Sequence, residues 1–360
     1  MTRIVSRSRL LVAGLAVSGL IVAGCGGSSS NKSSSSDSST SKAPQLAAAT
    51  LAGSGSTFQQ PFNELAIQEF QKGQPKVTVT YGGGGSGKGQ TDLKGNLVQW
   101  AGSDTPIKPA DAAGYKPVFY FPTVAAPITV SYNLSGVGKL QLSADTLSKI
   151  FQRQIVKWDD PAIKAENSGV SLPSTAITVV HRSDSSGTTA NFSDFLQKAA
   201  PSTWKLGSDK TIDWPAGTQS GNGNPGVAQV IKSTNGAVGY VDFSDAKQAG
   251  LSFASIKNSA GSFVAPSLDS ASAALASATV NTNLTYDPIN APGADAYPIT
   301  SPTYVIVYQS QTGAVGNALK GWLDFLLGPG QDLAQQVDFT KLPQSILSKA
   351  QAQVQQIKVS

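Results

Sequence analysis

The feature that most constrains the fold is a repeated arrangement in which a strand runs through glycine and serine into a helix. Residues 77–81 alternate as a strand and lead into YGGGGSGKGQT at 81–91. Residues 176–180 form a second, β-branched strand before HRSDSSGT at 181–188. A third turn of this composition, GSGSTF at 53–58, precedes the first helical pattern. Alternating strands and helices predict an α/β fold.

The three turns also predict a ligand. The first amides of a helix have no acceptor within the helix, and glycine lets a ligand approach the backbone. Aligned peptide dipoles add attraction for negative charge. One such turn is common, but three in one chain predict an oxyanion site.

Other segments complete the expected alternation. Residues 61–72 have a helical apolar face that Gly73 ends, and Ser143 is placed to cap a helix with buried positions 147, 150, 151 and 155. Further helices are expected at 189–199 and around 321–327, and a strand at 237–243.

The glycine run comes close to a nucleotide-binding loop. Gly82, Gly87 and Lys88 satisfy the first seven positions of G-x-x-x-x-G-K-[ST], but Gly89 stands where the magnesium-binding hydroxyl belongs. A degenerate ATPase, a flexible tether and a phosphate-binding loop of another kind are all open at this point.

The N-terminus predicts export. Three arginines precede an apolar run at 10–22, too short for the roughly 20 residues that cross a bilayer. Val22-Ala23-Gly24-Cys25 resembles the lipobox of bacterial lipoproteins, which implies a signal peptide at 1–24 and a lipid anchor (diacylglycerol and palmitate) on Cys25. Because exported proteins rarely meet ATP, export makes a nucleotide-binding loop at 82–89 less favoured.

Composition sets the domain plan. The serine-rich segment 25–50 cannot bury enough apolar surface to fold, so we expect a disordered tether there. Cys25 is the only cysteine, which excludes a disulfide within the chain. The formal charge of +5 falls to +2 without the three signal arginines, and no basic stripe favours nucleic acid. About 310 residues remain, enough for two lobes.

Several different short motifs follow one another along the chain. They are GSTF at 55–58, Tyr81 with GSG at 85–87, GSD at 102–104, FPT at 121–123, KWDD at 157–160, RSDSSGT at 182–188, GAVGY at 236–240 and YPIT at 297–300. Over residues 51–343 they resemble the phosphate-binding lipoprotein of bacterial high-affinity phosphate ABC transporters. The resemblance implies a type II periplasmic-binding-protein fold, in which each of two lobes is a mixed sheet flanked by helices.

The same resemblance implies function and ligands. Such a protein captures phosphate outside the cytoplasm and docks, as a monomer, on a membrane permease driven by a separate ATPase. It needs no cofactor. By motif position the ligands are the backbone amides of Thr57 and Phe58, the Thr57 hydroxyl, Ser86, Asp104, Arg182, Ser186, Gly187 and Thr188.

The chemistry of two members follows from the residues themselves. Arg182 offers a planar fork that matches two oxygens of a tetrahedral anion, and Asp184 is placed to hold it. An ionised Asp104 only accepts hydrogen bonds, so it favours phosphate, which carries a proton, over sulfate, which carries none. The alternative is that Asp104 caps a turn.

Departures from the family pattern concern two places. Lys88 and Gln90 stand where relatives have small residues, and Lys88 either adds charge near the site or, as we favour, points to solvent. Gln59-Gln60 separates Phe58 from Pro61, which predicts a rearranged helix start.

Catalysis has little support in the sequence. His181 is the only histidine, no serine has a G-x-S-x-G setting, and one histidine with one cysteine makes a metal site improbable. We therefore expect no enzyme and no metal, although a sensor of another oxyanion or, less favoured, a secreted phosphatase stays open.

The lobe boundaries follow from two extended segments. Residues 117–132 and 296–308 are β-branched and suit the crossovers between lobes. We expect one lobe at 51–125 plus 300–360 and the other at 126–299.

Overall fold

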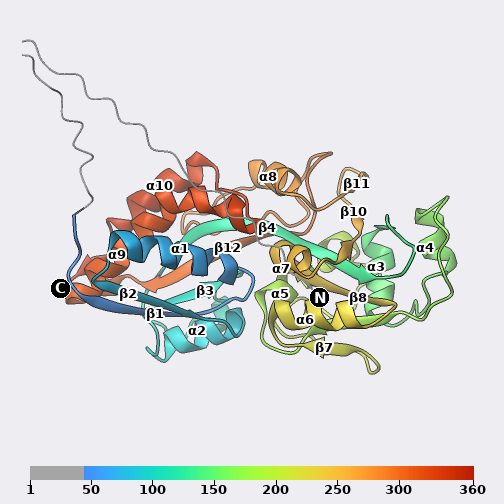
Figure 1. The fold of residues 1–360 in the computed structure, drawn as a ribbon, viewed down its shortest axis with the longest axis horizontal. Coiled ribbons are helices and arrows are strands. Elements are labelled where there is room, and N and C mark those ends of the chain that lie inside the picture. Colours follow the sequence, from blue (N-terminus) through green and yellow to red (C-terminus); the bar gives the residue numbers. More distant parts are fainter. Residues whose placement is uncertain (1–43) are drawn as a thin grey trace, which may run out of the picture. The chain divides into compact units, whose positions relative to one another are not determined.

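A nine-stranded mixed sheet runs through the computed structural model, which describes residues 44–360 (Figure 1). The strands follow the order β2-β1-β3-β12-β4-β8-β6-β7, and β9 pairs with β4 beside this path. Their bounds are β1 Ala49–Gly55, β2 Val77–Gly82, β3 Trp100–Ser103, β4 Val118–Asn133, β6 Thr178–Arg182, β7 Gln219–Gly221, β8 Ala237–Asp242, β9 Ser252–Phe253 and β12 Thr300–Tyr308.

The sheet has a parallel group at each end. β1 lies parallel to β2 and β3, and β6 lies parallel to β7 and β8. Between these groups, β12 and β4 run antiparallel to their neighbours. We refer to β2, β1, β3 and β12 as the first half of the sheet and to β8, β6 and β7 as the second half. The expected α/β fold class is confirmed.

Strand β4 belongs to both halves. Its residues 118–127 pair with β12, and its residues 128–133 pair with β8. The chain therefore passes from the first half to the second inside one continuous strand, and β12 brings it back. The segment expected to be extended at 117–132 is extended in β4, whereas of the segment expected at 296–308 only residues 300–308 are extended, and residues 298 and 299 form a turn.

Helices cover both faces of the sheet. Figure 1 draws α1, α9 and α10 on one side of the first half and α2 on the other. The α-helices are α1 Gln60–Gly73, α2 Ser86–Lys94, α3 Ala144–Phe151, α4 Pro161–Glu166, α5 Gly187–Ala199, α6 Gly223–Ser233, α7 Phe243–Gln248, α8 Leu268–Ala276, α9 Gly313–Leu327 and α10 Gln344–Val354. Two 3₁₀ helices span Pro109–Asp111 and Pro329–Val337. Short strands pair as β5 Gln141–Leu142, β10 Ser255–Lys257 and β11 Phe263–Val264, and as β13 Ser310–Gln311 with β14 Lys358–Val359.

Local expectations hold to within a few residues. Ser143 caps α3 as expected, accepting from the amide of Thr146 at 3.2 Å. Helix α5 begins two residues before its expected start, because Ser186 is its cap and accepts from the amide of Thr189. The strand expected to end at Phe243 ends one residue earlier, since Asp242 caps α7.

Aromatic side chains pack together in each half, within one continuous hydrophobic core. In the first half, Trp322 packs on Trp100 with ring centroids 6.0 Å apart and on Phe70 at 5.3 Å. In the second, Tyr240 stacks on Phe192 at 4.6 Å. Buried aromatic side chains contribute 150–250 Å² each, so these clusters hold the two halves without a disulfide.

The folded body begins earlier than expected. Residues 44–50 fall in the expected tether, yet Ala49 and Thr50 belong to β1. The side chain of Gln74 fixes the preceding segment, accepting from the amide of Leu46 at 2.9 Å and donating to the carbonyl of Pro44 at 3.0 Å. The tether boundary at residue 50 is therefore wrong. The signal peptide, Cys25 and the serine tract lie outside the described residues.

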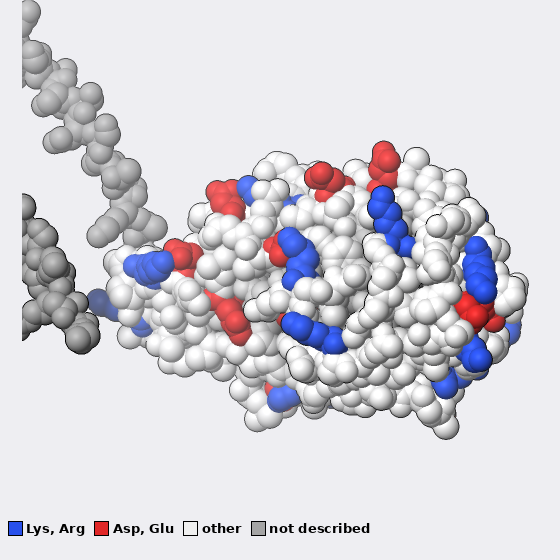
Figure 2. Space-filling model, turned by 45° about the vertical axis from the view of Figure 1, so that its right-hand side comes forward, with Lys and Arg blue, Asp and Glu red and all other residues white. Residues whose placement is uncertain are grey.

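Charged side chains are scattered over the surface. On the face drawn in Figure 2, lysines and arginines stand singly or beside acidic residues, with uncharged surface between them. Among the helices of residues 44–360, none has the length and apolar character needed to cross a bilayer.

Candidate functional site

Turns from both halves of the sheet meet at one place. The turn after β1, the turn between β2 and α2, and the residue after β3 belong to the first half, and the turn between β6 and α5 belongs to the second. The amide of Gly87 donates to the carbonyl of Ser185 at 2.9 Å, which joins the two glycine-serine turns directly. The sequence places both turns at carboxyl ends of strands, and tertiary folding turns these ends toward each other.

Gly187 marks the closest approach. A Cβ at this position would lie 2.4 Å from Ser86 Oγ and 2.7 Å from Asp104 Oδ2, so only glycine fits while the halves are in contact. The amides of Gly187 and Thr188 fall in the first turn of α5, where the helix itself provides no acceptor. They are available to a ligand held between the halves.

Asp104 is an acidic group in an enclosed position. Its residue is 1% exposed. Oδ2 lies 2.7 Å from Ser56 Oγ and 3.3 Å from Ser86 Oγ, whereas Oδ1 is buried with no hydrogen-bond partner. Burial raises the pKa of the Asp104 carboxyl to about 7, against the hydrogen bond from Ser56 and the positive charge of Arg182. One oxygen of this carboxyl is thus free to meet a ligand.

Arg182 supplies the positive charge from the second half. Its side chain is 1% exposed and forms a two-point ion pair with Asp184, Nε to Oδ1 at 2.8 Å and Nη2 to Oδ2 at 2.5 Å. Nη1 donates to Thr188 Oγ1 at 3.3 Å. Burial alone would raise the pKa of Asp184, but the hydrogen bonds and charge of Arg182 outweigh it and hold that pKa below its ordinary value. The expected partnership of Arg182 and Asp184 is present.

Asn224 belongs to this cluster although the sequence analysis missed it. Its amide and Nδ2 donate to Thr57 Oγ1 at 3.1 and 3.3 Å, and Nδ2 also donates to Thr188 Oγ1 at 3.2 Å. Because its acceptor sites are used, the Thr57 hydroxyl can turn its hydrogen toward a ligand. The signal was GNGNPG at 221–226, a fourth glycine-rich turn between a strand and a helix.

Phe58 differs from the expectation. Its ring is fully buried and packs edge-on against Phe339, with centroids 5.7 Å apart. Its amide, expected to face the ligand, donates to Ser56 Oγ at 3.0 Å. Helix α1 begins at Gln60, one residue before its expected start, and Gln59 at its cap position makes no side-chain capping bond. In this structure the Phe58 amide serves Ser56.

Two further residues lie outside the cluster. Lys88 is half exposed and pairs with Asp92 at 2.5 Å, one helical turn along α2. The ring of His181 stacks on Trp214 with centroids 5.0 Å apart, and burial lowers the pKa of His181. Its ring nitrogens contact the carbonyl of Arg182 and the hydroxyl of Thr218. Within residues 44–360, no three acidic, histidine or cysteine side chains gather to hold a metal.

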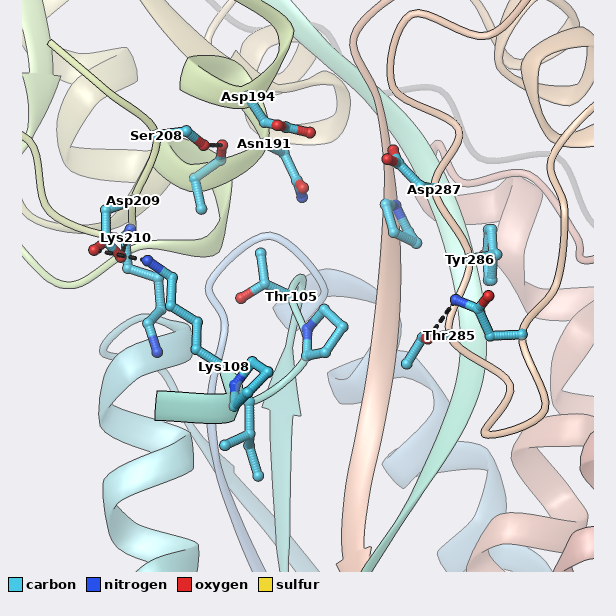
Figure 3. Close-up of a pocket in the computed structure, with 16 residues that line it drawn as sticks. Thr105, Lys108, Asn191, Asp194, Ser208, Asp209, Lys210, Thr285, Tyr286 and Asp287 are labelled. Carbon is cyan, nitrogen blue, oxygen red and sulfur yellow. Dashed lines mark hydrogen bonds and ion pairs between the residues drawn. The ribbon is translucent and has the colours of Figure 1, made fainter. Parts of the chain in front are cut away.

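The cluster is closed to solvent, and other contacts join the halves around it. Ser86, Ser186 and Thr188 have no exposed surface. Figure 3 draws a neighbouring cavity of about 360 Å³ that Thr105, Asn191 and Lys210 help to line. Beside it, Lys108 pairs with Asp209 at 2.7 Å. Asn191 Nδ2 donates to the carbonyl of Asp104 at 3.0 Å and to Ser301 Oγ at 2.7 Å.

Comparison with known proteins places the chain in a family. Residues 40–329 match the model of the PBP superfamily domain. The phosphate-binding protein PstS of Pasteurella multocida (strain Pm70) is 34% identical over 313 residues, covering 85% of this chain and 90% of the relative. The chain belongs to the PstS family of phosphate-binding proteins.

A second relative and a solved structure match this chain over a similar extent. Phosphate-binding protein PstS 2 of Mycobacterium tuberculosis (strain ATCC 25618 / H37Rv) is 35% identical, covering 85% of this chain and 87% of the relative. The solved structure of a high-affinity periplasmic phosphate-binding protein with phosphate bound superimposes with a TM-score of 0.71 at 23% identity, covering 84% of this chain and 93% of that chain. This structural likeness shows that the fold is shared.

Proposed function

We propose that this PstS-family protein captures inorganic phosphate outside the cytoplasm and delivers it to an ABC-type import permease. The observation that carries the proposal is that one buried cluster holds both Arg182 and Asp104, an acidic group whose Oδ1 is buried and has no hydrogen-bond partner. A site with a guanidinium and free amides suits an anion. A free carboxylate oxygen in the same site suits an anion that still carries a proton, and phosphate is such an anion.

The donors come from both halves of the sheet. Arg182 and the first amides of α5 approach from the second half, and the hydroxyls of Thr57 and Ser86 from the first. The full proposed set is Thr57, Phe58, Ser86, Asp104, Arg182, Ser186, Gly187 and Thr188, with Asp184 holding the guanidinium. Phe58 joins it only if its amide leaves Ser56 Oγ or is shared with the anion.

Asp104 is the proposed filter against sulfate. An ionised carboxylate facing a fully ionised anion leaves two acceptors opposed in a desolvated site, which costs several kcal/mol. Phosphate avoids this cost because it donates its proton to Oδ1. The buried, unpartnered Oδ1 supports this role over the alternative of a turn cap.

Capture requires the halves to separate. Because the cluster is closed to solvent, an anion enters only through movement about β4 and β12, the two strands that connect the halves. We propose residues 44–125 plus 300–360 as one lobe and 126–299 as the other. The Lys108 to Asp209 ion pair and the Asn191 and Asn224 hydrogen bonds across the halves then belong to the closed form.

Delivery places the protein at a membrane. The N-terminal export pattern supports an extracytoplasmic protein, and one similar solved protein is named as periplasmic. Another is named as the substrate-binding protein of a phosphate ABC transporter, which supports a permease as partner. Acylation of Cys25 would hold a monomer at the outer face of the cytoplasmic membrane. Mass spectrometry of the membrane fraction tests the anchor, and an unmodified Cys25 in the mature protein would contradict it.

Titration calorimetry with inorganic phosphate tests the central proposal. We expect one phosphate per chain, weak competition by sulfate, and loss of that discrimination in Asp104→Asn. Arsenate, which also carries a proton, should compete better than sulfate. Preferential binding of sulfate or molybdate would make the protein a binder of another oxyanion, and turnover of a chromogenic phosphate ester would make it an enzyme.

A further inference from the structure

A second buried serine, Ser56, is hydrogen-bonded to Asp104, the acidic group of the site. Ser56 is 1% exposed, and its Oγ lies 2.7 Å from Asp104 Oδ2, the shorter of the two serine contacts to this carboxyl. The amide of Phe58 donates to the same Oγ at 3.0 Å. Ser56 thus receives one hydrogen bond and has one hydrogen to give, and that hydrogen goes to Asp104.

This arrangement distinguishes the two states of Asp104. When the carboxyl is ionised, Oδ2 accepts from Ser56 and Oδ1 is free to accept from a protonated anion. When the carboxyl is neutral, its proton sits on Oδ1, because Oδ2 already faces serine donors. The neutral form then donates a hydrogen bond to the ligand, and a sulfate oxygen can accept it. Because hydrogen bonds to a charged acceptor are the stronger ones, Ser56 favours the ionised form.

In an occupied site, Ser86 does not stabilise the ionised form of Asp104 as Ser56 does. Its Oγ lies 3.3 Å from Asp104 Oδ2 and accepts from the amide of Asp104 at 3.1 Å. As a proposed ligand, Ser86 turns its hydrogen toward the anion. Ser56 faces Asp104 from β1 and its turn, so it keeps its hydrogen on the carboxylate whether or not the site is filled.

The other ionisable groups around Asp104 do not replace this control. Arg182 favours the ionised carboxyl, but Asp184 already offsets its charge. Tyr304 on β12 is buried and Tyr81 on β2 is partly buried, and burial raises the pKa of both phenols, so both stay neutral. Tyr81 Oη also donates to the carbonyl of Ser56 at 2.8 Å, which holds the serine in place.

We propose that Ser56 is a positioning residue that sets the pH range over which the site selects phosphate over sulfate, acting through the Oγ to Oδ2 hydrogen bond. This inference rests on the proposed phosphate function and deepens it. Burial that raises the pKa of Asp104 to about 7 supports it, since the carboxyl then changes state within a range that an exported protein meets. Above this range the site excludes sulfate, and below it the exclusion weakens.

Ser56→Ala tests the proposal by a pH profile. Sulfate competition with radiolabelled phosphate is measured from pH 5 to 9 in the full chain. Losing one hydrogen bond to the carboxylate shifts its ionisation about tenfold, so the pH at which sulfate begins to compete should rise by about one unit. Ser54→Ala is the matched control, because Ser54 lies in β1 two residues before Ser56 and its Oγ donates to Asp92 Oδ2 at 2.6 Å instead of to Asp104. Its profile should match the wild type.

Two further variants keep the test decisive. Ser56→Cys has nearly the same shape and is a poor donor, so it should shift the profile in the same direction even where Ser56→Ala folds badly. In an Asp104→Asn background, Ser56→Ala should add no pH dependence. An unchanged sulfate profile in folded Ser56 variants that bind phosphate would overturn the inference alone. Absence of phosphate binding by the wild type would overturn the proposed function and this inference with it.

Discussion

A single methyl group at Gly187 should keep the two halves from closing. Gly187→Ala suits the first turn of α5, because alanine has a higher helix propensity than glycine. The new Cβ would lie 2.4 Å from Ser86 Oγ and 2.8 Å from Asp104 Cβ, both in the first half of the sheet. Ordinary contact needs about 3.4 Å, so the halves must separate by roughly 1 Å or the Ser86 and Asp104 side chains must turn away.

Either response removes ligand contacts. A hydrogen bond that lengthens by about 1 Å is lost, and one to a charged group contributes about 1.5–3 kcal/mol. Loss of two such bonds weakens phosphate binding by at least about 3 kcal/mol, or roughly 100-fold in Kd. Because the clash exists only in the closed form, the thermal stability of the phosphate-free protein should stay the same or rise.

Calorimetry and thermal unfolding with and without phosphate measure both effects. Gly82→Ala is the matched control, because Gly82 begins the glycine-rich turn that contacts the Gly187 turn, and a Cβ at Gly82 meets no atom within 4 Å. This control should bind phosphate as the wild type does. A Gly187→Ala protein that binds phosphate within a few-fold of the wild type would refute the reasoning that closure at this point makes the site.

Four other changes have defined outcomes. Burial raises the pKa of Asp104 to about 7 from 3.8, so the folded protein keeps a proton that the unfolded chain has lost between these values. Its contribution to stability is present below about pH 4 and is lost as the pH rises through 7, and Asp104→Asn should flatten the fall in Tm over this range. Asp184→Ala leaves the Arg182 guanidinium buried and unpaired, which should cost about 3–5 kcal/mol in urea unfolding without phosphate, with partial recovery when phosphate is added; a cost below about 1 kcal/mol would contradict the pairing. Asn224→Ala removes the side-chain bonds to Thr57 and Thr188 and should speed phosphate release about tenfold in stopped-flow measurements, whereas the exposed Asn222→Ala should not. Lys88→Ala should leave the phosphate Kd unchanged, because its ion pair with Asp92 is half exposed; a large loss of affinity would return Lys88 to the site.

Much of the site was predictable because its parts are local. A strand that ends in glycine and serine before a helix can be recognised within about ten residues, and capping is decided within one turn. Ser186 therefore caps α5 in a segment whose sequence predicts the start of a helix. Arg182 likewise forms its ion pair with Asp184, only two residues away. The errors are local too. The sequence predicts tether at Ala49 and Thr50 because they closely follow the serine-rich tract and alanine has little strand propensity.

Only the tertiary structure decided which distant segments of the chain pair with each other. Ser56 meets Asp104 across 48 residues, and Asn224 meets Thr57 across 167. The order β2-β1-β3-β12-β4-β8-β6-β7 and the crossing inside β4 bring these positions together, and no local pattern encodes that order. The sequence alone determined which side chains can hold a protonated anion, since that depends on their chemistry. The fold decided which oxygen of Asp104 is free to meet it, since that depends on what is packed around the carboxyl.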